Sequence, residues 1–207
     1  MISVRKLQIS RGSSRLPEIS FEIPQGEYAV LMGPTGCGKT SLLECIVGLV
    51  KQDSGEIIIA EKEVTQLPAA ARHIGYVPQD AALFAGLSVR ENIGFALSIR
   101  GIKEITIQER VEELAASMEI SNLLDRGIRG LSGGERQRIA LCRAMALRPR
   151  VMLLDEPLSS LDEISREKMC NLLGKIHCES GATFLHVTHS SAEATRLASM
   201  RLERILV

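Results

Sequence analysis

The sequence predicts an α/β fold with a mostly parallel sheet, an antiparallel group of strands near the N-terminus and an inserted helical segment. Continuous apolar runs at 28–33 (YAVLMG), 151–155 (VMLLD) and 182–188 (ATFLHVT) are typical of strands buried on both faces. Helical patterns follow these runs, and strands that alternate with helices favour a parallel sheet. Between residues 88 and 130 the pattern is helical, which indicates an inserted helical subdomain.

Each remaining element follows from its own pattern. The stretches 2–10 (ISVRKLQIS) and 18–23 (EISFEI) alternate apolar and polar residues, as half-buried strands do, and 55–60 (GEIIIA) and 74–77 (IGYV) are further strand candidates. A helix is expected over 41–50 and another after Asp162. Capping boxes at 88–91 (SVRE) and 106–109 (TIQE) predict two helix starts.

Together these elements predict one domain. Residues 1–87 and 131–207 form its core with the antiparallel strands, and about 88–130 forms the helical subdomain.

Composition excludes several classes of protein. Of 207 residues, 45% are hydrophobic, enough for a sizeable core, and 25 basic residues balance 25 acidic ones. A balanced charge with 3% aromatic residues and no Trp argues against a nucleic-acid partner. Five cysteines without a Cys-x-x-Cys pair fit reduced thiols. We expect no secretory leader, because the opening residues lack a long apolar segment.

The stretch GPTGCGKT at 33–40 predicts a phosphate-binding loop, because it follows a strand and opens a helix. Its glycines let successive backbone N–H groups point at phosphate oxygens, and the helix N-terminus adds partial positive charge. Lys39 can reach the β- and γ-phosphates, and the Thr40 hydroxyl can bind Mg²⁺. The expected nucleotide-binding residues of this loop are Gly33, Pro34, Thr35, Gly36, Cys37, Gly38, Lys39, Thr40 and Ser41.

Two acidic residues end the strand at 151–155. Ligands of open α/β sheets bind at the carboxyl ends of the strands, where Asp155 lies. We expect Asp155 to hold Mg²⁺ and Glu156 to polarise an attacking water.

The stretch LSGGERQRIALCRA at 131–144 places two glycines at the start of a helix. Ser132 and Glu135 form a capping box, so the free N–H groups of this helix start point at an anion. Gly133 and Gly134 allow a phosphate to come close to the backbone.

These motifs resemble, in order and approximate spacing, those of the nucleotide-binding subunits of ATP-binding-cassette (ABC) transporters. The resemblance rests on GPTGCGKT, VPQ, LSGGERQR, VMLLDEP, SSLD and VTH, and it covers nearly the whole chain. It implies a P-loop NTPase core, an ATPase that uses ATP and Mg²⁺, and a head-to-tail homodimer. In that dimer Ser132, Gly133 and Gly134 contact ATP held by the phosphate loop of the second copy.

The resemblance also assigns roles to single residues. Gln79 corresponds to the glutamine that touches Mg²⁺ and the attacking water. Asp162 corresponds to the loop acid that crosses the dimer interface, and His189 to the histidine that contacts the γ-phosphate. His186 competes for the last role, but it lies within an apolar strand and is expected to be a core residue. His73 and His177 belong to no motif and are expected at the surface.

Three departures from the family pattern stand out. An aromatic residue usually stacks on adenine near position 11, where this chain has Arg11, whose planar guanidinium can also stack. After His189 the family usually has aspartate, and this chain has Ser190, which is expected to form a capping box with Glu193. The closing strands after His189 are expected to be shortened, with no regulatory domain after them.

The resemblance implies a transporter energy subunit, held at the cytoplasmic face of the membrane by transmembrane permease subunits and served by a substrate-binding protein. The segments 83–97 and 131–162 look most like bacterial importers for oxyanions such as molybdate or sulfate, polyamines, sugars or thiamine. A short permease helix is expected to dock near Gln79 and the helical subdomain. The alternatives are a soluble ABC ATPase, such as an iron–sulfur assembly ATPase, and a non-hydrolysing nucleotide sensor.

Overall fold

The computed structural model describes residues 1–12, 14–203 and 205–206. Its strands are β1 (Ile2–Gln8), β2 (Ser10–Arg11), β3 (Ser14–Arg15), β4 (Ile19–Ile23), β5 (Tyr28–Leu31), β6 (Ser54–Ile59), β7 (Lys62–Glu63), β8 (Ile74–Val77), β9 (Val151–Asp155), β10 (Thr183–Val187) and β11 (Met200–Leu202). Its helices are α1 (Lys39–Val47), α2 (Val89–Ser98), α3 (Glu104–Ser117), α4 (Gly133–Met145), α5 (Glu163–Ser180) and α6 (Ser191–Leu197), with 3₁₀ turns η1 (Ala69–Ala71) and η2 (Ser121–Leu123).

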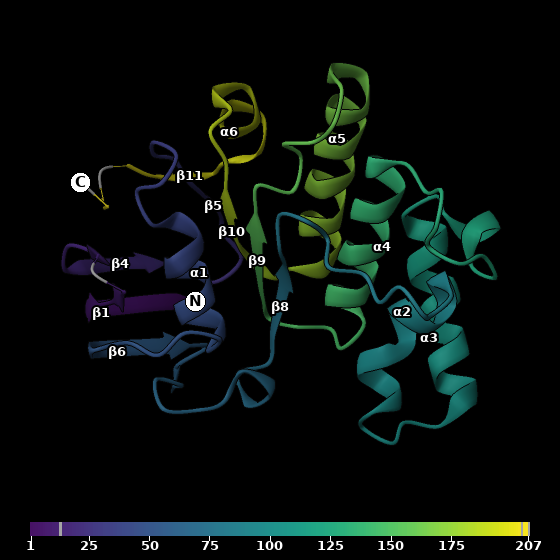
Figure 1. Ribbon diagram of the computed structural model, residues 1–207, viewed down its shortest axis with the longest axis horizontal. Coiled ribbons are helices and arrows are strands. Elements are labelled where there is room, and N and C mark those ends of the chain that lie inside the picture. Colours follow the sequence, from purple (N-terminus) through teal and green to yellow (C-terminus); the bar gives the residue numbers. More distant parts are fainter. Residues whose placement is uncertain (13, 204, 207) are drawn as a thin grey trace.

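A parallel sheet crosses the middle of the molecule (Figure 1). Within the described residues its order is β11-β5-β10-β9-β8, and every pairing in it is parallel. Val187 of β10 pairs with Leu31 on one side and with Asp155 on the other. The segments that follow β5, β8, β9 and β10 therefore leave the sheet at one common edge.

An antiparallel sheet of order β4-β1-β6-β7 forms a second layer beside α1. Leu42, Leu43 and Ile46 of α1 belong to one apolar core with residues of both sheets. Helix α1 therefore packs between the two sheets, with its N-terminus at the edge where β5 ends.

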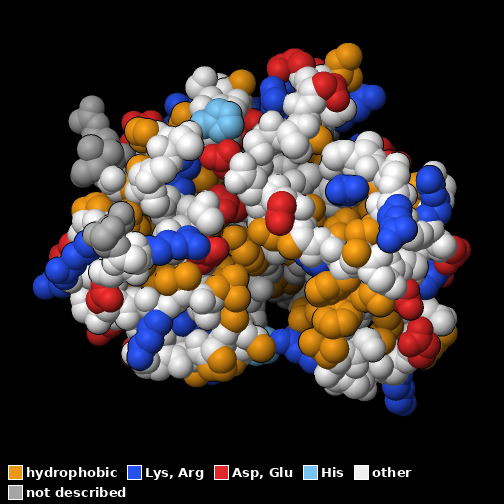
Figure 2. All heavy atoms as spheres, in the orientation of Figure 1, with side chains coloured by type: hydrophobic (Ala, Val, Ile, Leu, Met, Phe, Trp, Pro, Cys, Tyr) orange, Lys and Arg blue, Asp and Glu red, His pale blue; other side chains and the backbone are white. Residues whose placement is uncertain are grey.

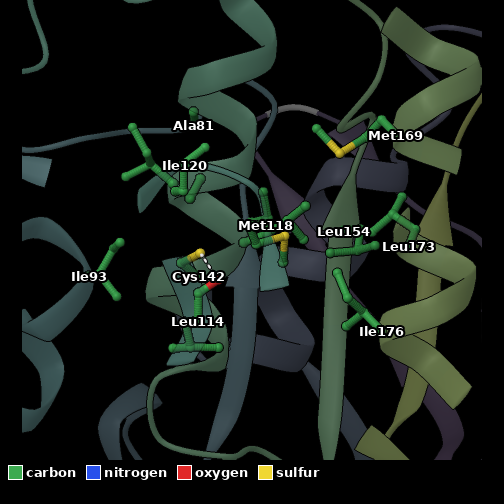
Figure 3. Packing of buried hydrophobic residues seen from close by; sticks show 14 of the residues in the cluster. Ala81, Ile93, Leu114, Met118, Ile120, Cys142, Leu154, Met169, Leu173 and Ile176 are labelled. Atoms are coloured by element: carbon green, nitrogen blue, oxygen red, sulfur yellow. Dashed lines mark hydrogen bonds between the residues drawn. The ribbon is translucent and has the colours of Figure 1, made fainter. Parts of the chain in front are cut away.

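The two faces of the parallel sheet pack in different cores. Side chains alternate between faces along a strand. Leu153 packs on the side of α1, whereas Met152 and Leu154 pack on the side of α4 and α5. Figure 3 shows Leu154 of β9 beside Leu173 and Ile176 of α5. Burial on both faces explains why this strand is a continuous apolar run in the sequence.

Helices α2 and α3 pack against α4, on the side of the molecule away from the antiparallel sheet (Figure 1). The predicted capping box of α2 is present, since the Ser88 side chain accepts from Glu91 N and the Glu91 side chain accepts from Ser88 N. The predicted helix start at 106–109 is wrong. Helix α3 begins at Glu104, with Lys103 as its N-cap, because the helical backbone starts a turn before the Thr106 side chain could cap it.

The predicted mixed architecture of parallel sheet, antiparallel sheet and helices is confirmed. Within 1–12, 14–203 and 205–206, no helix has both the length and the apolar character needed to cross a bilayer.

Candidate nucleotide-binding site

Four loops meet at the carboxyl edge of the parallel sheet. The phosphate loop (residues 33–40) follows β5, and Gln79 follows β8. Glu156 follows β9, and His189 follows β10. The parallel pairing of these strands brings residues from four distant parts of the sequence to one place, as open α/β sheets do at their ligand sites.

Two glycines of the predicted phosphate-binding motif have backbone conformations that favour glycine. Gly36 and Gly38 have φ of 83° and 102°, in the left-handed region that L-residues avoid. A Cβ atom at Gly38 would lie 2.4 Å from Cδ2 of Leu16, so the Leu16 side chain would have to move to admit it. Gly38 is the N-cap of α1, which leaves the first N–H groups of the helix directed at the loop.

Lys39 lies folded into this loop. Its residue is 5% exposed, and its Nζ donates to the carbonyl oxygens of Gly33 at 2.9 Å and Pro34 at 2.8 Å. Two of the three ammonium donors therefore hold the loop curled. The buried ammonium supplies positive charge at the position where the sequence predicts phosphate.

Asp155, the last residue of β9, is buried with an unpaired oxygen. It is 2% exposed, and its Oδ1 has no hydrogen-bond partner among the described residues. Burial raises the pKa of the Asp155 carboxyl, and the nearby Glu156 and Glu44 carboxylates raise it further. Hydrogen bonding from Thr40 and the charge of Lys39 act in the opposite direction.

Such a group fits a bound cation. A buried carboxylate with an unpaired oxygen beside a threonine hydroxyl is a hard oxygen donor set, which Mg²⁺ prefers. Within the described residues no group of three His, Cys, Asp or Glu side chains could hold a metal. The pair Thr40 and Asp155 therefore fits a magnesium ion whose other ligands come from water and phosphate.

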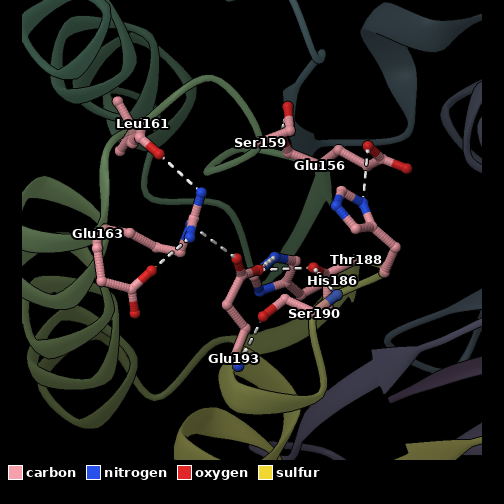
Figure 4. Close-up of polar contacts among 10 residues, drawn as sticks. Glu156, Ser159, Leu161, Glu163, His186, Thr188, Ser190 and Glu193 are labelled. Carbon is pink, nitrogen blue, oxygen red and sulfur yellow. Dashed lines mark hydrogen bonds and ion pairs between the residues drawn. The ribbon is translucent and has the colours of Figure 1, made fainter.

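Glu156 and His189 face each other across this edge. The Nδ1 of His189 lies 3.3 Å from Oε2 of Glu156 (Figure 4). Glu156 has φ of 44°, in the left-handed region that residues with a side chain adopt less readily. Its N–H donates to Val187 O at 3.0 Å, and its carbonyl oxygen accepts from the Ser159 hydroxyl at 2.9 Å. The sheet and the following turn thus hold this backbone conformation.

The predicted helix start at Ser132 is present. The Ser132 hydroxyl accepts from Glu135 N, and Oε2 of Glu135 accepts from Ser132 N at 2.7 Å. The bonds that the Ser132 N–H and hydroxyl donate to the Glu135 carboxylate lower the pKa of that carboxyl. We call Ser132, Gly133 and Gly134 the signature segment. It begins α4, and Ser132 and Gly133 are exposed.

The glycines of the signature segment are not required by the chain itself. Cβ atoms at Gly133 and Gly134 would make only ordinary contacts, at 3.6 Å or more, with Ser160 and Leu161. Neither glycine has a positive φ. The fold of this chain therefore does not by itself require glycine at either position.

The loop of residues 159–162, the crossing loop, lies against the signature segment. Asp162 is exposed and caps α5, where its Oδ1 accepts from Ser165 N at 3.0 Å. This bond lowers the pKa of the Asp162 carboxyl. The structure therefore gives Asp162 a capping role within the chain, whereas its predicted role in a dimer stays a prediction.

Gln79 is exposed beside the end of β8. Its carbonyl oxygen accepts from Nε2 of Gln137 at 3.2 Å, so its backbone is tied to α4. Arg11 is also exposed, and its Nη1 donates to Glu44 Oε2 at 2.9 Å and to Ser41 Oγ at 3.2 Å. Arg11 therefore lies over the first turns of α1, next to the phosphate loop.

The two unassigned histidines differ. His73 is exposed as expected, but His177 is only partly exposed, and its Nε2 lies 2.8 Å from Gly26 O while its ring packs edge-on against Tyr28. His186 is fully buried, as expected, and burial lowers its pKa to about 3.

Sequence reasoning missed a polar cluster below His189, which is formed by Arg166, Thr188 and Glu193. Glu193 is 4% exposed, although the sequence suggested only a cap. Its backbone N–H does donate to the Ser190 hydroxyl, but its Oε2 accepts from the Thr188 hydroxyl at 2.6 Å. The expected capping box is therefore only half formed. The available signal for this cluster was the position of Glu193, the third residue of α6, on the side of the helix that faces the core.

A model of the family described as ABC transporter matches residues 16–159. The chain is 43% identical to a molybdate/tungstate import ATP-binding protein of Methanocaldococcus jannaschii over 197 residues, which cover 95% of this chain and 65% of that protein. It is 45% identical to an sn-glycerol-3-phosphate import ATP-binding protein of Chromobacterium violaceum, over 93% of this chain and 51% of that one. It is 43% identical to the maltose/maltodextrin import ATP-binding protein of Escherichia coli, over 87% of this chain and 49% of that one.

A solved structure shares the fold over its whole length. It is an ATP-binding cassette in a dimeric, post-hydrolysis state with bound ADP and Pi, and it superposes with a TM-score of 0.85 at 28% identity, covering 99% of this chain and 97% of that one. The chain spans between 49% and 65% of the length of the three import proteins. The family match and these identities show that the chain belongs to the ABC transporter family of ATP-binding proteins.

Proposed function

We propose that this chain binds Mg-ATP, closes with a second copy into a head-to-tail dimer, hydrolyses the ATP, and thereby drives solute import through separate transmembrane subunits. One observation carries the split site. The signature segment is a capped, exposed helix start whose two glycines leave room for a group that this chain does not supply. The related cassette, whose structure is a dimer with bound ADP and Pi, supports dimer formation by this chain.

Binding would begin at the phosphate loop. The N–H groups at the start of α1 and the Lys39 ammonium would neutralise the phosphates. Lys39 would exchange its bonds to Gly33 O and Pro34 O for phosphate oxygens. Arg11 would stack its guanidinium on the base, held in place by Ser41 and Glu44.

Thr40, Asp155 and Gln79 would hold Mg²⁺. The ion would neutralise charge that develops on the phosphate oxygens during transfer. The buried Asp155 Oδ1 has no hydrogen-bond partner among the described residues, and Mg²⁺ would supply one.

Hydrolysis would use Glu156 and His189. The Glu156 carboxylate would accept a proton from the attacking water. His189, 3.3 Å from that carboxylate, would orient it and contact the γ-phosphate. The strained backbone of Glu156 would keep its side chain directed out of the sheet edge.

The transport role has support from a cleft that borders the helical segment at the end of α2. It has a volume of about 600 Å³ and lies between η1 and α2. Its apolar lining includes Ala69, Ile74 and Ile99, and Ile99 is 69% exposed. Figure 2 shows a hollow at the lower edge of the molecule, with hydrophobic side chains beside it. An exposed apolar cleft of this kind suits a short helix from a permease subunit.

The relatives named above are import proteins for chemically different solutes: molybdate or tungstate, glycerol phosphate and maltose. We infer from this variety that solute selectivity belongs to other subunits of the importer, namely the permease and a substrate-binding protein. The chain would then act at the cytoplasmic face of the membrane, held there by the permease.

The transport role is tested by tagging the chain, solubilising native membranes in mild detergent and identifying what co-purifies. A polytopic membrane protein in a one-to-one ratio is the expected result. Ile99→Asp should abolish this recovery and leave ATP-driven dimerisation unchanged. Ile105→Asp is the matched control, because Ile105 is 60% exposed but lies outside the cleft lining. Recovery with soluble partners alone would contradict the proposal and favour a soluble ATPase.

A further inference from the structure

We propose that the Arg166–Glu193 ion pair is a positioning link that couples the two ATP sites of the dimer. The signature segment and the crossing loop would face one ATP, whereas Glu156 and His189 would act on the other. The ion pair would transmit a displacement of the first group to the second. The inference rests on the proposed head-to-tail ATPase. The pair belongs to none of the nucleotide-binding motifs.

The first step joins the signature segment to the crossing loop. A Cβ placed at Gly133 or Gly134 would be 3.7 Å and 3.8 Å from Cδ2 of Leu161. Leu161 is 6% exposed and packs in the same core as α4. Docking on a nucleotide would shift the start of α4. This shift would displace Leu161, because closely packed side chains transmit displacement.

The second step joins the crossing loop to Arg166. The Arg166 Nη2 donates to the carbonyl oxygen of Leu161 at 2.7 Å, and its Nη1 donates to Glu163 at 2.9 Å. Its Nε faces Oε1 of Glu193 at 3.7 Å. One planar guanidinium thus contacts the crossing loop on one side and α6 on the other (Figure 4). A rigid fork of donors is suited to holding such groups in fixed relation.

The third step is the buried carboxylate of Glu193. It is 4% exposed, and Arg166 is the cationic side chain that faces it. The neutral ring of His186 approaches the same carboxylate, with Nε2 3.5 Å from Oε2. A buried carboxylate that loses its cation is costly, so movement of Arg166 away from Glu193 would be opposed.

The fourth step reaches the catalytic edge. Oε2 of Glu193 accepts from the Thr188 hydroxyl at 2.6 Å, and the same hydroxyl oxygen accepts from Ser190 N at 3.0 Å. These two bonds flank His189 and fix the turn that carries it. His189 in turn lies 3.3 Å from Glu156. Neighbouring groups therefore connect the start of α4, through Leu161, Arg166 and Glu193, to the residues expected to hydrolyse ATP.

The consequence follows from the geometry of a head-to-tail dimer. Each chain would give its signature segment to one ATP and its Glu156 and His189 to the other. A link within one chain then connects two different ATP molecules. Docking of the signature segment on one ATP would align His189 and Glu156 on the second, so that hydrolysis depends cooperatively on ATP concentration.

The test compares Glu193→Gln with the wild type in steady-state ATP hydrolysis by the isolated chain. Glutamine keeps the size of the side chain and an oxygen for the Thr188 hydroxyl, and removes only the charge that faces Arg166. We expect kcat to fall about 10-fold and the Hill coefficient for ATP to fall toward one, with ATP-driven dimerisation retained. Arg166→Met should give the same changes. The double variant should be no worse than either single one, because one link is broken in each case.

A matched control is available on the same two helices. The exposed pair Arg196–Glu167, at 3.1 Å, also joins α6 to α5 but does not contact the crossing loop. Glu167→Gln should leave kcat and the Hill coefficient unchanged. If Glu193→Gln and Arg166→Met alter only the melting temperature, or act additively, the link is refuted. A wild-type Hill coefficient of one would also refute it, whereas absence of any ATP hydrolysis by the wild type would instead refute the proposed function.

Discussion

The imidazole of His189 and the carboxylate of Glu156 lie 3.3 Å apart, although the two residues are 33 positions apart in the chain. Neighbouring parallel strands bring them together. Val187, two residues before His189, pairs with Asp155, one residue before Glu156. Glu156 is directed by a left-handed backbone that the sheet holds in place. This pair is the proposed catalytic centre of ATP hydrolysis.

Replacing Glu156 by glutamine removes the proton acceptor and keeps the shape of the side chain. We expect Glu156→Gln to lower kcat by about 100-fold or more, with little change in ATP binding. Phosphate release and nucleotide binding measured on the same sample check this. A variant that hydrolyses ATP at the wild-type rate would remove Glu156 from the mechanism.

Gly134→Ala tests whether a second copy approaches the signature segment. The added Cβ meets only Leu161 at 3.8 Å, so the fold should accept it and gain up to about 1 kcal/mol of helix stability. The ATP-driven dimer should weaken about 10-fold or more, because the methyl group occupies the room for a phosphate. The free energy of unfolding and the dimer dissociation constant are the two measurements.

Gly174→Ala, within α5, serves as its control, since a Cβ there also makes an ordinary contact, at 3.7 Å from Leu197. It should leave dimerisation unchanged. Equal dimerisation by Gly134→Ala and wild type would mean that the glycine has no role at an interface.

The stability of the nucleotide-free protein should depend on pH through Asp155. Its folded pKa is raised, chiefly by burial, so the ionised carboxyl destabilises the fold above that pKa, and the effect disappears below the unfolded value. Asp155→Asn should therefore be more stable than wild type by about 1 kcal/mol at pH 8. This advantage should shrink as the pH falls toward 4 and the wild-type carboxyl takes up its proton.

Thermal unfolding of both proteins across this pH range provides the measurement. Mg-ATP should raise the melting temperature of the wild type and should do so much less for Asp155→Asn. An advantage that stays constant from pH 8 to pH 4 would show that the Asp155 carboxyl is not the cause.

Cys37, half-buried within the phosphate loop, gives a chemical test of occupancy. Alkylation with N-ethylmaleimide should abolish ATP hydrolysis, because the adduct fills the phosphate site, and bound ATP should slow the inactivation. Cys178 is exposed as well, so Cys37→Ser is the necessary control and should resist inactivation. Inactivation of that variant at the wild-type rate would place the sensitive thiol elsewhere.

Local patterns predicted the elements of this fold well. The continuous apolar run at β9 is a direct consequence of burial on two faces, and the apolar residues Ile2, Val4 and Leu7 of β1 all pack in one core. The phosphate loop was predictable because glycine, as at Gly36 and Gly38, adopts the required left-handed backbone most readily. The helix start at Ser132 was equally clear, because its capping box is local in the chain.

Features that depend on distant contacts were not predictable. The start of α3 at Glu104 has no side-chain cap, so no local signal marks it. His177 has an unremarkable sequence context and is only partly exposed because its ring packs on Tyr28. The contact of Arg166 with Glu193 joins residues 27 positions apart, and only the packing of α6 against α5 brings them together.

The split site is tested by the mass of Glu156→Gln in solution, determined by light scattering with and without saturating Mg-ATP. The account predicts a monomer without nucleotide and a dimer with it, and it predicts that adding Gly134→Ala weakens that dimer. A protein that remains monomeric with Mg-ATP, while the wild-type monomer hydrolyses ATP at full rate, would contradict the split site.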